Sequence, residues 1–226
     1  STGMFHEDNY STTYDIAILS RYLINKFPNY YHLFAETEFE WSGIKQNNRN
    51  PLLYKEMGAD GLKTGHLSAS GYGLAASAVQ DGRRLISVTN GFSSSKKRSQ
   101  GSARLLTWGF REFTNINISQ AGEVFSEIEI PLAKKMVQVT PSQNIKVTVS
   151  KANKDKIIQN IRVVPNISAP LPAGSVVATL EVVLSDNEKV NFDLETVNEV
   201  EKTGIIGRFF SFVINLITSL FSIIFS

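Results

Sequence analysis

The sequence predicts an α+β protein in which an antiparallel sheet with helices is followed by a small all-β, sandwich-like domain and a C-terminal amphipathic helix. Three observations carry this prediction. Residues 71–80 and 84–90 are apolar runs separated by a short Asp-Gly turn, which is a strong hairpin signal. Beyond residue 115, short runs rich in Val, Ile and Thr alternate with turn residues. At the C-terminus, no charged residue follows Arg208. We therefore predict domains at residues 1–115, 116–200 and 201–226.

Composition narrows the class of protein. The chain has 226 residues, of which 42% are hydrophobic and 19% charged, so it is long enough for one medium or two small globular domains. Its net charge of +2 comes without a basic stripe, which argues against nucleic acid as a partner. The absence of cysteine excludes disulfides and thiol catalysis. Because His6, His32 and His66 have no metal-ligand spacing, we expect neither a metal nor a cofactor.

The N-terminus shows no export signal, because no charged segment leads into an apolar one. Three explanations stay open. A precursor segment is absent from this chain, the gene product starts late, or the protein is cytosolic.

The first domain opens with an amphipathic helix over residues 12–27. Thr12 and Asp15 have the spacing of a capping box, and Pro28 lies just past the end. Its predicted apolar face is formed by Ile16, Leu19, Leu23, Ile24 and Phe27. Residues 36–50 predict a strand and a polar turn, since Phe39 and Trp41 alternate with polar neighbours.

The hairpin predicted at residues 71–90 follows a strand-like segment that contains Lys63-Thr64-Gly65. We expect this K-T-G strand and the two hairpin strands to pair antiparallel. A helix over residues 96–113 would then cover one side of the sheet. Its predicted apolar face is formed by Leu105, Trp108 and Phe113.

The second domain is predicted from its strand-like runs alone, and we find no catalytic cluster inside it. Turn residues separate the runs, as in a small sandwich or barrel. The runs cover residues 125–130, 135–139, 145–149, 161–164, 176–184 and 190–194.

The C-terminal segment predicts a membrane-associated helix. Its polar residues recur every three or four positions and form a narrow stripe, while most of its surface is apolar. We favour an amphipathic anchor over a membrane span, with docking on another subunit as the alternative. The expected anchor residues are Phe209, Phe210, Phe212, Val213, Ile214, Leu216, Ile217, Leu220 and Phe221.

The K-T-G triplet belongs to a longer set of segments that carry a family resemblance. These are residues 11–20 (STTYDIAILS), 41–44 (WSGI), 48–50 (NRN), 60–66 (DGLKTGH), 75–78 (AASA) and 83–86 (RRLI). Together they resemble the C-terminal half of the catalytic domain of penicillin-binding D-alanyl-D-alanine carboxypeptidases, the low-molecular-mass class that trims peptidoglycan stem peptides. The β domain and the C-terminal helix follow in the order found in that family, so the resemblance covers nearly the whole chain.

The resemblance implies a partial β-lactamase/transpeptidase-like domain and a role for each matching residue. Lys63 would place a positive charge beside the attacking serine, and Thr64 would hydrogen-bond the terminal D-alanine carboxylate. The N–H of His66, after Gly65, would form half of the oxyanion hole. Arg98 would help to hold the substrate carboxylate. The implied partners are the peptidoglycan stem peptide, the cytoplasmic membrane at its periplasmic face and, once an N-terminal half completes the site, β-lactam antibiotics.

The sequence departs from the family at its most important elements. The family's Ser-x-x-Lys and Ser-Gly-Asn elements lie upstream of the first residue here, so we expect the chain to be inactive alone. The literal Ser-x-x-Lys matches at Ser93 and Ser94, and the Ser-x-Asn match at Ser142, lack the structural context and are interpreted as chance.

We also expect the first 115 residues to be unstable alone, because the family's sheet contains upstream strands, whereas the β domain could fold by itself. Three alternatives to a split carboxypeptidase stay open. The first is a non-enzymatic, membrane-anchored module that binds peptidoglycan or protein. The second is a decayed gene product without function, and the third is an acyl-transfer enzyme of the β-lactamase kind.

Overall fold

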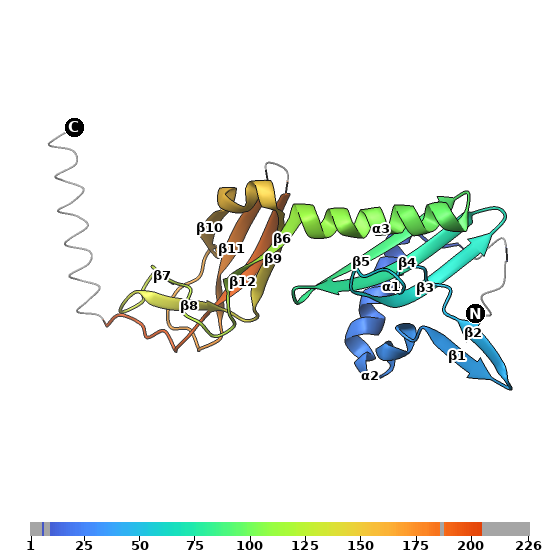
Figure 1. The fold of residues 1–226 in the computed structure, drawn as a ribbon. Coiled ribbons are helices and arrows are strands. Elements are labelled where there is room, and N and C mark those ends of the chain that lie inside the picture. The colour runs from blue at the N-terminus through green and yellow to red at the C-terminus, as the bar shows by residue number, and fades with distance from the viewer. Residues whose placement is uncertain (1–5, 7–9, 186–187, 205–226) are drawn as a thin grey trace. The chain divides into compact units, whose positions relative to one another are not determined.

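The structure is a computed structural model that describes residue 6, residues 10–185 and residues 188–204. The chain divides into two compact units, Ser1–Phe113 (unit 1) and Thr114–Ser226 (unit 2). Figure 1 shows the elements of both units. Unit 1 combines helices with a small sheet, and unit 2 is built almost entirely of strands.

The sheet of unit 1 has three antiparallel strands in the order β3-β4-β5. They are β3 (Ala59–Leu67), β4 (Gly71–Gln80) and β5 (Arg83–Phe92). Asp81 and Gly82 join β4 to β5 with φ angles of 50° and 71°, as a two-residue type I′ turn requires. The predicted Asp-Gly hairpin and its antiparallel pairing with the K-T-G strand are confirmed.

Two helices cover this sheet from opposite sides (Figure 1), α1 (Thr13–Lys26) and α3 (Ser95–Glu112). Alternate residues of a strand point to opposite faces. Leu74 packs in one cluster with Leu106 of α3 on one face. On the other face, Ser77 contacts Arg84, which lies over the ring of Tyr31. Tyr31 ends the short helix α2 (Pro28–Tyr31), which leads into the 3-10 helix η1 (His32–Phe34). The prediction of a helix covering one side of the sheet is confirmed.

The N-terminus of α1 follows the sequence prediction, but its packing face does not. Thr12 accepts a hydrogen bond from the N–H of Asp15, and Asp15 accepts one from the N–H of Thr12, so the capping box is confirmed. In the predicted apolar face, however, Leu19 and Phe27 are exposed. The buried residue is Ser20, whose hydroxyl donates to the Ile16 carbonyl. Helical periodicity predicts which side of α1 is apolar, but the extent of the neighbouring sheet determines how many of these side chains are buried.

The packing face of α3 also differs from the prediction. Leu105 and Trp108 are 39% and 47% exposed, and Phe113 is the first residue of strand β6 rather than part of the helix. The buried residues of α3 are Arg98, Ser102 and Leu106. A small residue with a partner for its hydroxyl allows close approach, which hydrophobicity alone did not indicate.

Residues 36–50 form a separate hairpin of two short strands, β1 (Glu38–Trp41) and β2 (Ile44–Asn47). Its cross-strand register pairs Trp41 with Ile44 and Phe39 with Gln46, so these side chains share one face. The large apolar side chains on this face are exposed. The prediction of a strand and a turn here is confirmed, with a second strand added.

Unit 2 contains two sheets, and the larger one is antiparallel throughout. The five-stranded sheet has the order β10-β11-β12-β8-β7, and β6 pairs with β9. The six predicted runs all contain strands, whereas β6 was missed. Between β9 and β10 the chain forms the 3-10 helix η2 (Lys151–Lys156). The strands are β6 (Phe113–Ser119), β7 (Ser126–Ile128), β8 (Val137–Pro141), β9 (Ile145–Ser150), β10 (Ile158–Val163), β11 (Val176–Ser185) and β12 (Glu188–Thr196).

One apolar core holds the two sheets of unit 2 together. From β9 it takes Ile145, Val147 and Val149, which are all buried. These residues join Leu180 of β11 and Leu194 of β12 in one buried cluster. The alternation of buried and exposed residues along β8 and β9 is that of strands with one face on a core.

Of the predicted membrane-anchor helix at residues 201–226, residues 201–204 are described and are not helical, and residues 205–226 lie outside the described residues. Across the part of the chain that the structure describes, no helix is long and apolar enough to cross a membrane.

Candidate functional site

The K-T-G residues lie on an edge strand. β3 pairs with β4 on one side, with Lys63 opposite Ala75 and Gly65 opposite Gly73. On its other side, no strand among the described residues pairs with β3. Lys63 is exposed and its ammonium group donates to the carbonyl of Thr64 at 2.6 Å. The strand therefore offers a free backbone edge beside an exposed positive charge.

The predicted site residues divide between the two faces of β3. Because residues alternate along a strand, Lys63 lies on one face and Thr64 and His66 on the other. Thr64 stands opposite Leu74, which packs toward α3, so Thr64 and His66 lie on the α3 side. Access to both faces at once requires a ligand that lies along the strand edge.

Tyr72 links His66 to Arg98. His66 and Tyr72 form a cross-strand pair whose ring centroids are 3.9 Å apart, with an angle of 32° between the rings. The guanidinium carbon of Arg98 lies 5.8 Å from the centroid of the Tyr72 ring. Such cation–π contacts are favourable at this distance. The structure thus brings His66 and Arg98 to the same aromatic ring, while no described contact joins Arg98 to Lys63 or Thr64.

Arg98 is almost completely buried, which is rare for an arginine without a charged partner. It is 6% exposed, its Nη2 donates to the Ser95 hydroxyl at 3.1 Å, and its Nε has no partner. Burial lowers the pKa of Arg98 from its ordinary value, and the nearby Tyr72 opposes this effect. An unpaired buried N–H of a guanidinium is costly, and this Nε has almost no surface open to a ligand.

The position of Arg98 follows from the close packing of α3 against the sheet. A Cβ atom at Gly101 would lie 2.3 Å from Cζ of Phe92, so a larger residue would force the Phe92 ring to shift. Ser102 and Thr89 share a hydroxyl hydrogen bond of 2.7 Å. The register between β4 and β5 shifts at Tyr72, which introduces a bulge beside the start of α3. The bulge and the glycine place the first turn of α3 over Tyr72.

A polar network holds the start of β3 from the other side. Asp60 forms an ion pair of 2.7 Å with Arg84 and accepts a hydrogen bond from Tyr31 at 3.0 Å. Burial raises the pKa of Tyr31 to about 12, so it stays a donor at neutral pH. The buried Asn50 donates to the carbonyl of Gly61 at 2.8 Å. These contacts explain why the matching segments at residues 48–50, 60–66 and 83–86 surround the K-T-G triplet.

The literal Ser-x-x-Lys and Ser-x-Asn matches occupy structural positions. Ser94 caps α3, and its hydroxyl accepts a hydrogen bond from the N–H of Lys97 at 3.1 Å. Asn144 accepts one from the N–H of Ala121 at 2.9 Å in unit 2. Both contacts are ordinary loop and cap interactions.

Tyr72 is the candidate site residue that the sequence prediction missed. The sequence contained a signal for it. The Asp-Gly turn sets the register of the β4–β5 hairpin, and the K-T-G strand pairs with β4, which brings Tyr72 opposite His66. The described residues contain no group of three or more His, Asp and Glu side chains that could hold a metal ion.

Each of the two units matches a family model. Residues 1–94 match the family model described as D-alanyl-D-alanine carboxypeptidase, and residues 113–202 match the one described as penicillin-binding protein 5, C-terminal domain. The D-alanyl-D-alanine carboxypeptidase DacD of Salmonella typhimurium is 35% identical over 212 residues, which are 91% of this chain and 54% of the relative. The DacA enzyme of Haemophilus influenzae is 32% identical over 97% of this chain and 57% of its own length.

Solved structures agree with the sequence relatives. Penicillin-binding protein 5 from Haemophilus influenzae superposes with a TM-score of 0.79 at 32% identity, covering 88% of this chain and 59% of that chain. Penicillin-binding protein 6B from Escherichia coli gives a TM-score of 0.61 at 33% identity, over 83% of this chain and 50% of that chain. The chain spans little more than half the length of the curated relatives it matches.

Proposed function

We propose that this chain, which belongs to the D-alanyl-D-alanine carboxypeptidase family, forms one wall of a serine-type carboxypeptidase site that removes the terminal D-alanine from peptidoglycan stem peptides. One observation carries the proposal. The K-T-G residues stand on a free sheet edge among the described residues, and the guanidinium of Arg98 lies over Tyr72, the cross-strand partner of His66.

The free edge of β3 suits a peptide substrate. An extended peptide adds to an exposed strand through backbone hydrogen bonds, and neighbouring side chains then read its ends. A Cβ atom at Gly65 would meet no atom within 4 Å, so space is open beside the strand at this residue. A peptide lying along β3 would pass Lys63 and reach His66, next to which Tyr72 and Arg98 are stacked.

Each residue then has a defined role in the reaction. The Lys63 ammonium stabilises negative charge that develops beside the attacking serine, and the N–H of His66 donates to the oxyanion. Thr64 and Arg98 hold the terminal carboxylate, with the Arg98 guanidinium as the charged donor. This chain thus supplies substrate binding and electrostatic stabilisation. The nucleophile and its base come from the family's upstream elements.

The chain alone is proposed to be inactive, and its apolar C-terminal segment is proposed to hold it on the periplasmic face of the cytoplasmic membrane. The first proposal rests on the K-T-G element being present without Ser-x-x-Lys or Ser-Gly-Asn partners of the right context. The second rests on the uncharged apolar residues from Phe209 to Phe221.

A non-enzymatic binding module is the second candidate function. It is favoured by Arg98, because a guanidinium placed over Tyr72 and next to His66 can bind a carboxylate without any nucleophile. The two candidates share the binding residues and differ only in whether a serine is acylated.

Acylation by a fluorescent penicillin separates the candidates. The reagent is added to the full chain alone and to the chain mixed with the N-terminal half of the Haemophilus relative, and label is read on a denaturing gel. We expect label only on the added half and only in the mixture. Label on this chain would show that one of its own serines is a nucleophile and would contradict the proposal. No label anywhere would favour the binding module.

Two variants of the chain make the gel experiment specific. Lys63→Ala should abolish label in the mixture, because it removes the charge beside the serine. Lys55→Ala is the matched control, since Lys55 is an equally charged, exposed residue in a loop of unit 1. Equal labelling with both variants would contradict the role of Lys63.

A further inference from the structure

A groove of about 490 Å³ lies at one end of unit 2, where a strand ladder opens. The segment of residues 197–203 runs beside residues 132–138 and is hydrogen-bonded to it at both ends. At one end the N–H of Val197 donates to the Gln138 carbonyl at 3.0 Å. At the other end the N–H of Lys134 donates to the Glu201 carbonyl at 3.0 Å.

Between these two contacts the backbone turns away from β8. Val200 pairs instead with Leu171, donating to its carbonyl at 2.7 Å and accepting from its N–H at 3.1 Å. Residues 135–137 and 198–200 are therefore separated, and the space between them is the groove. Val137 and Val200, both buried, contribute its apolar part. A volume of this size lies in the range of small-ligand sites.

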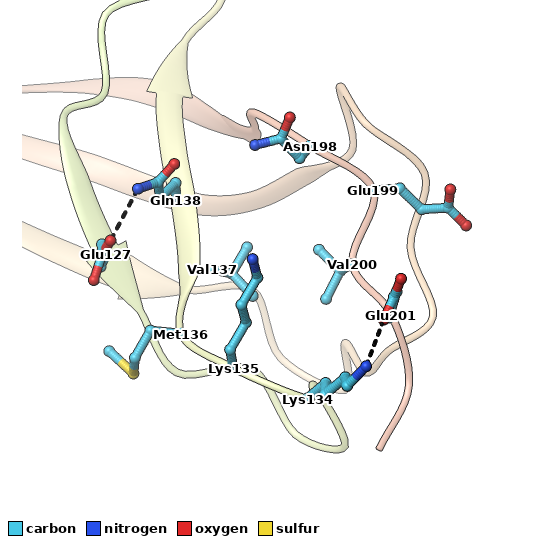
Figure 2. Close-up of a pocket in the computed structure, with 10 residues that line it drawn as sticks. All are labelled: Glu127, Lys134, Lys135, Met136, Val137, Gln138, Asn198, Glu199, Val200 and Glu201. Carbon is cyan, nitrogen blue, oxygen red and sulfur yellow. Dashed lines mark hydrogen bonds and ion pairs between the residues drawn. The ribbon is translucent and has the colours of Figure 1, made fainter. Parts of the chain in front are cut away.

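Most polar side chains that line the groove are already engaged. Glu127 accepts a hydrogen bond from Gln138 at 3.0 Å, and Lys134 forms an ion pair with Glu201 at 3.2 Å. Figure 2 shows both contacts at the rim. They reduce the capacity of these four side chains to bind a ligand.

Lys135 differs from its neighbour Lys134. Figure 2 shows the Lys135 side chain rising between β8 and the segment of residues 198–201, whereas the Glu199 carboxylate points away from the groove. Within the described residues, Lys135 has no ion pair or hydrogen bond, and Asn198 also lacks a side-chain partner. A cation and an amide beside two valines match a carboxylate next to an apolar group.

We infer that this groove binds a short peptide through its C-terminal carboxylate, with Lys135 as the charged contact and Val137 and Val200 as the apolar surface. The site lies in unit 2 and does not include the K-T-G strand. The choice of a cell-wall peptide as the probe rests on the proposed function. The binding itself rests on the uncommitted Lys135 and Asn198 and on the shape of the groove, whose lining also carries Glu127, Glu199 and Glu201.

The probe is N-acetyl-D-alanyl-D-alanine, which has a single free carboxylate, and the control ligand is its C-terminal amide. Each is titrated into the ¹⁵N-labelled full chain in a nonionic detergent, and amide shifts are followed by NMR. We expect the acid to move the signals of residues 135–138 and 198–200 and the amide to leave them in place. Equal shifts with both ligands would overturn the inference.

Two lysine variants provide the matched test. Lys135→Gln should weaken binding at the groove about tenfold, the effect of losing one charge-assisted hydrogen bond. Lys134→Gln makes the same change of charge one residue away, and it should change binding less than about twofold because Lys134 is committed to Glu201. Equal weakening by both variants would show a nonspecific charge effect and overturn the inference.

The same titration keeps the groove apart from the K-T-G site. Shifts confined to residues 63–66 and the surroundings of Arg98 would support the proposed function and overturn the groove. Shifts confined to the groove would support the inference, and the proposed function would still be tested by labelling of the mixture with the N-terminal half. Shifts at neither place would overturn the groove.

Discussion

Unit 2 buries a continuous core between two sheets, whereas unit 1 has a small core and leaves much of its apolar surface uncovered. The buried cluster of unit 1 consists of Leu52, Leu74, Ala76, Ala78 and Leu106. That of unit 2 draws on most of its strands. Unit 1 also exposes many large apolar side chains: Tyr14, Ile18, Leu19, Tyr22, Phe27, Tyr30, Leu33, Phe39, Trp41 and Ile44.

The contrast indicates that the two units are stabilised in different ways. A core that closes on itself supports independent folding, while a three-stranded sheet with exposed apolar helices gains stability when another surface covers it. The uncovered surface of unit 1 belongs to the same unit as the candidate site. The residues that would complete the site would therefore also cover the exposed apolar surface of unit 1.

Separating the units would test this contrast most strongly. Residues 114–204 alone should unfold in a single cooperative transition, because their core is complete. Residues 1–113 alone should aggregate or bind a hydrophobic dye, since they expose a strand edge and apolar helices. Thermal unfolding by circular dichroism with dye fluorescence measures both. A cooperative transition for residues 1–113 would contradict the interpretation.

Truncating one buried leucine in each unit would sharpen the comparison. Leu180→Ala should lower the free energy of unfolding of unit 2 by about 2–5 kcal/mol and leave it folded. Leu106→Ala removes a similar volume from the smaller core of unit 1 and should abolish the penicillin labelling of the mixture with the N-terminal half. Urea unfolding of the full chain measures the first effect, and the labelling gel measures the second. The exposed Val176 supplies a control through Val176→Ala, which should have little effect on either unit.

Changing Tyr72 tests whether the aromatic contact positions the site of unit 1. Tyr72→Leu removes the ring that His66 and Arg98 share and should slow penicillin labelling in the mixed assay about tenfold. Tyr72→Phe keeps the ring and should label within about twofold of the unchanged chain. The His66 ring signals in NMR should move with the leucine variant. Equal labelling by both variants would show that the ring does not position the site.

The smallest effect concerns Glu181 in unit 2. Burial by itself raises the pKa of Glu181, but Asn160, Arg162 and Lys189 outweigh it, and the pKa lies below its ordinary value of 4.5. A lowered folded-state pKa means that the ionised form stabilises unit 2 above pH 4.5, and that this contribution is lost as the pH falls through the folded-state pKa.

We therefore expect Glu181→Gln to lower the stability of unit 2 at pH 7 and the difference from the unchanged chain to shrink on acidification. Urea unfolding between pH 7 and pH 3 measures this difference. Glu188→Gln changes an exposed carboxylate near one end of the same sheet and serves as the control. A difference that stays constant with pH would contradict the assignment.

Short-range sequence patterns determined most of the helices, strands and turns. The Thr12 and Asp15 capping box, the Asp81-Gly82 turn and the strand runs of unit 2 depend on a few neighbouring residues, and each was predicted correctly. The K-T-G strand and its antiparallel pairing were equally readable. The family resemblance then identified Lys63 and Arg98 as candidates, although nothing local relates these two residues.

Tertiary structure alone decided which faces are buried and which residues meet. Ser20 and Ser102, rather than Leu19 and Leu105, face the sheet because close packing favours small side chains with partners for their hydroxyls. The stack of His66, Tyr72 and Arg98 joins residues from two strands and a helix, and the groove beside Lys135 exists because Val200 pairs with Leu171. Such contacts depend on register and on distances between remote segments, which no short stretch of sequence contains.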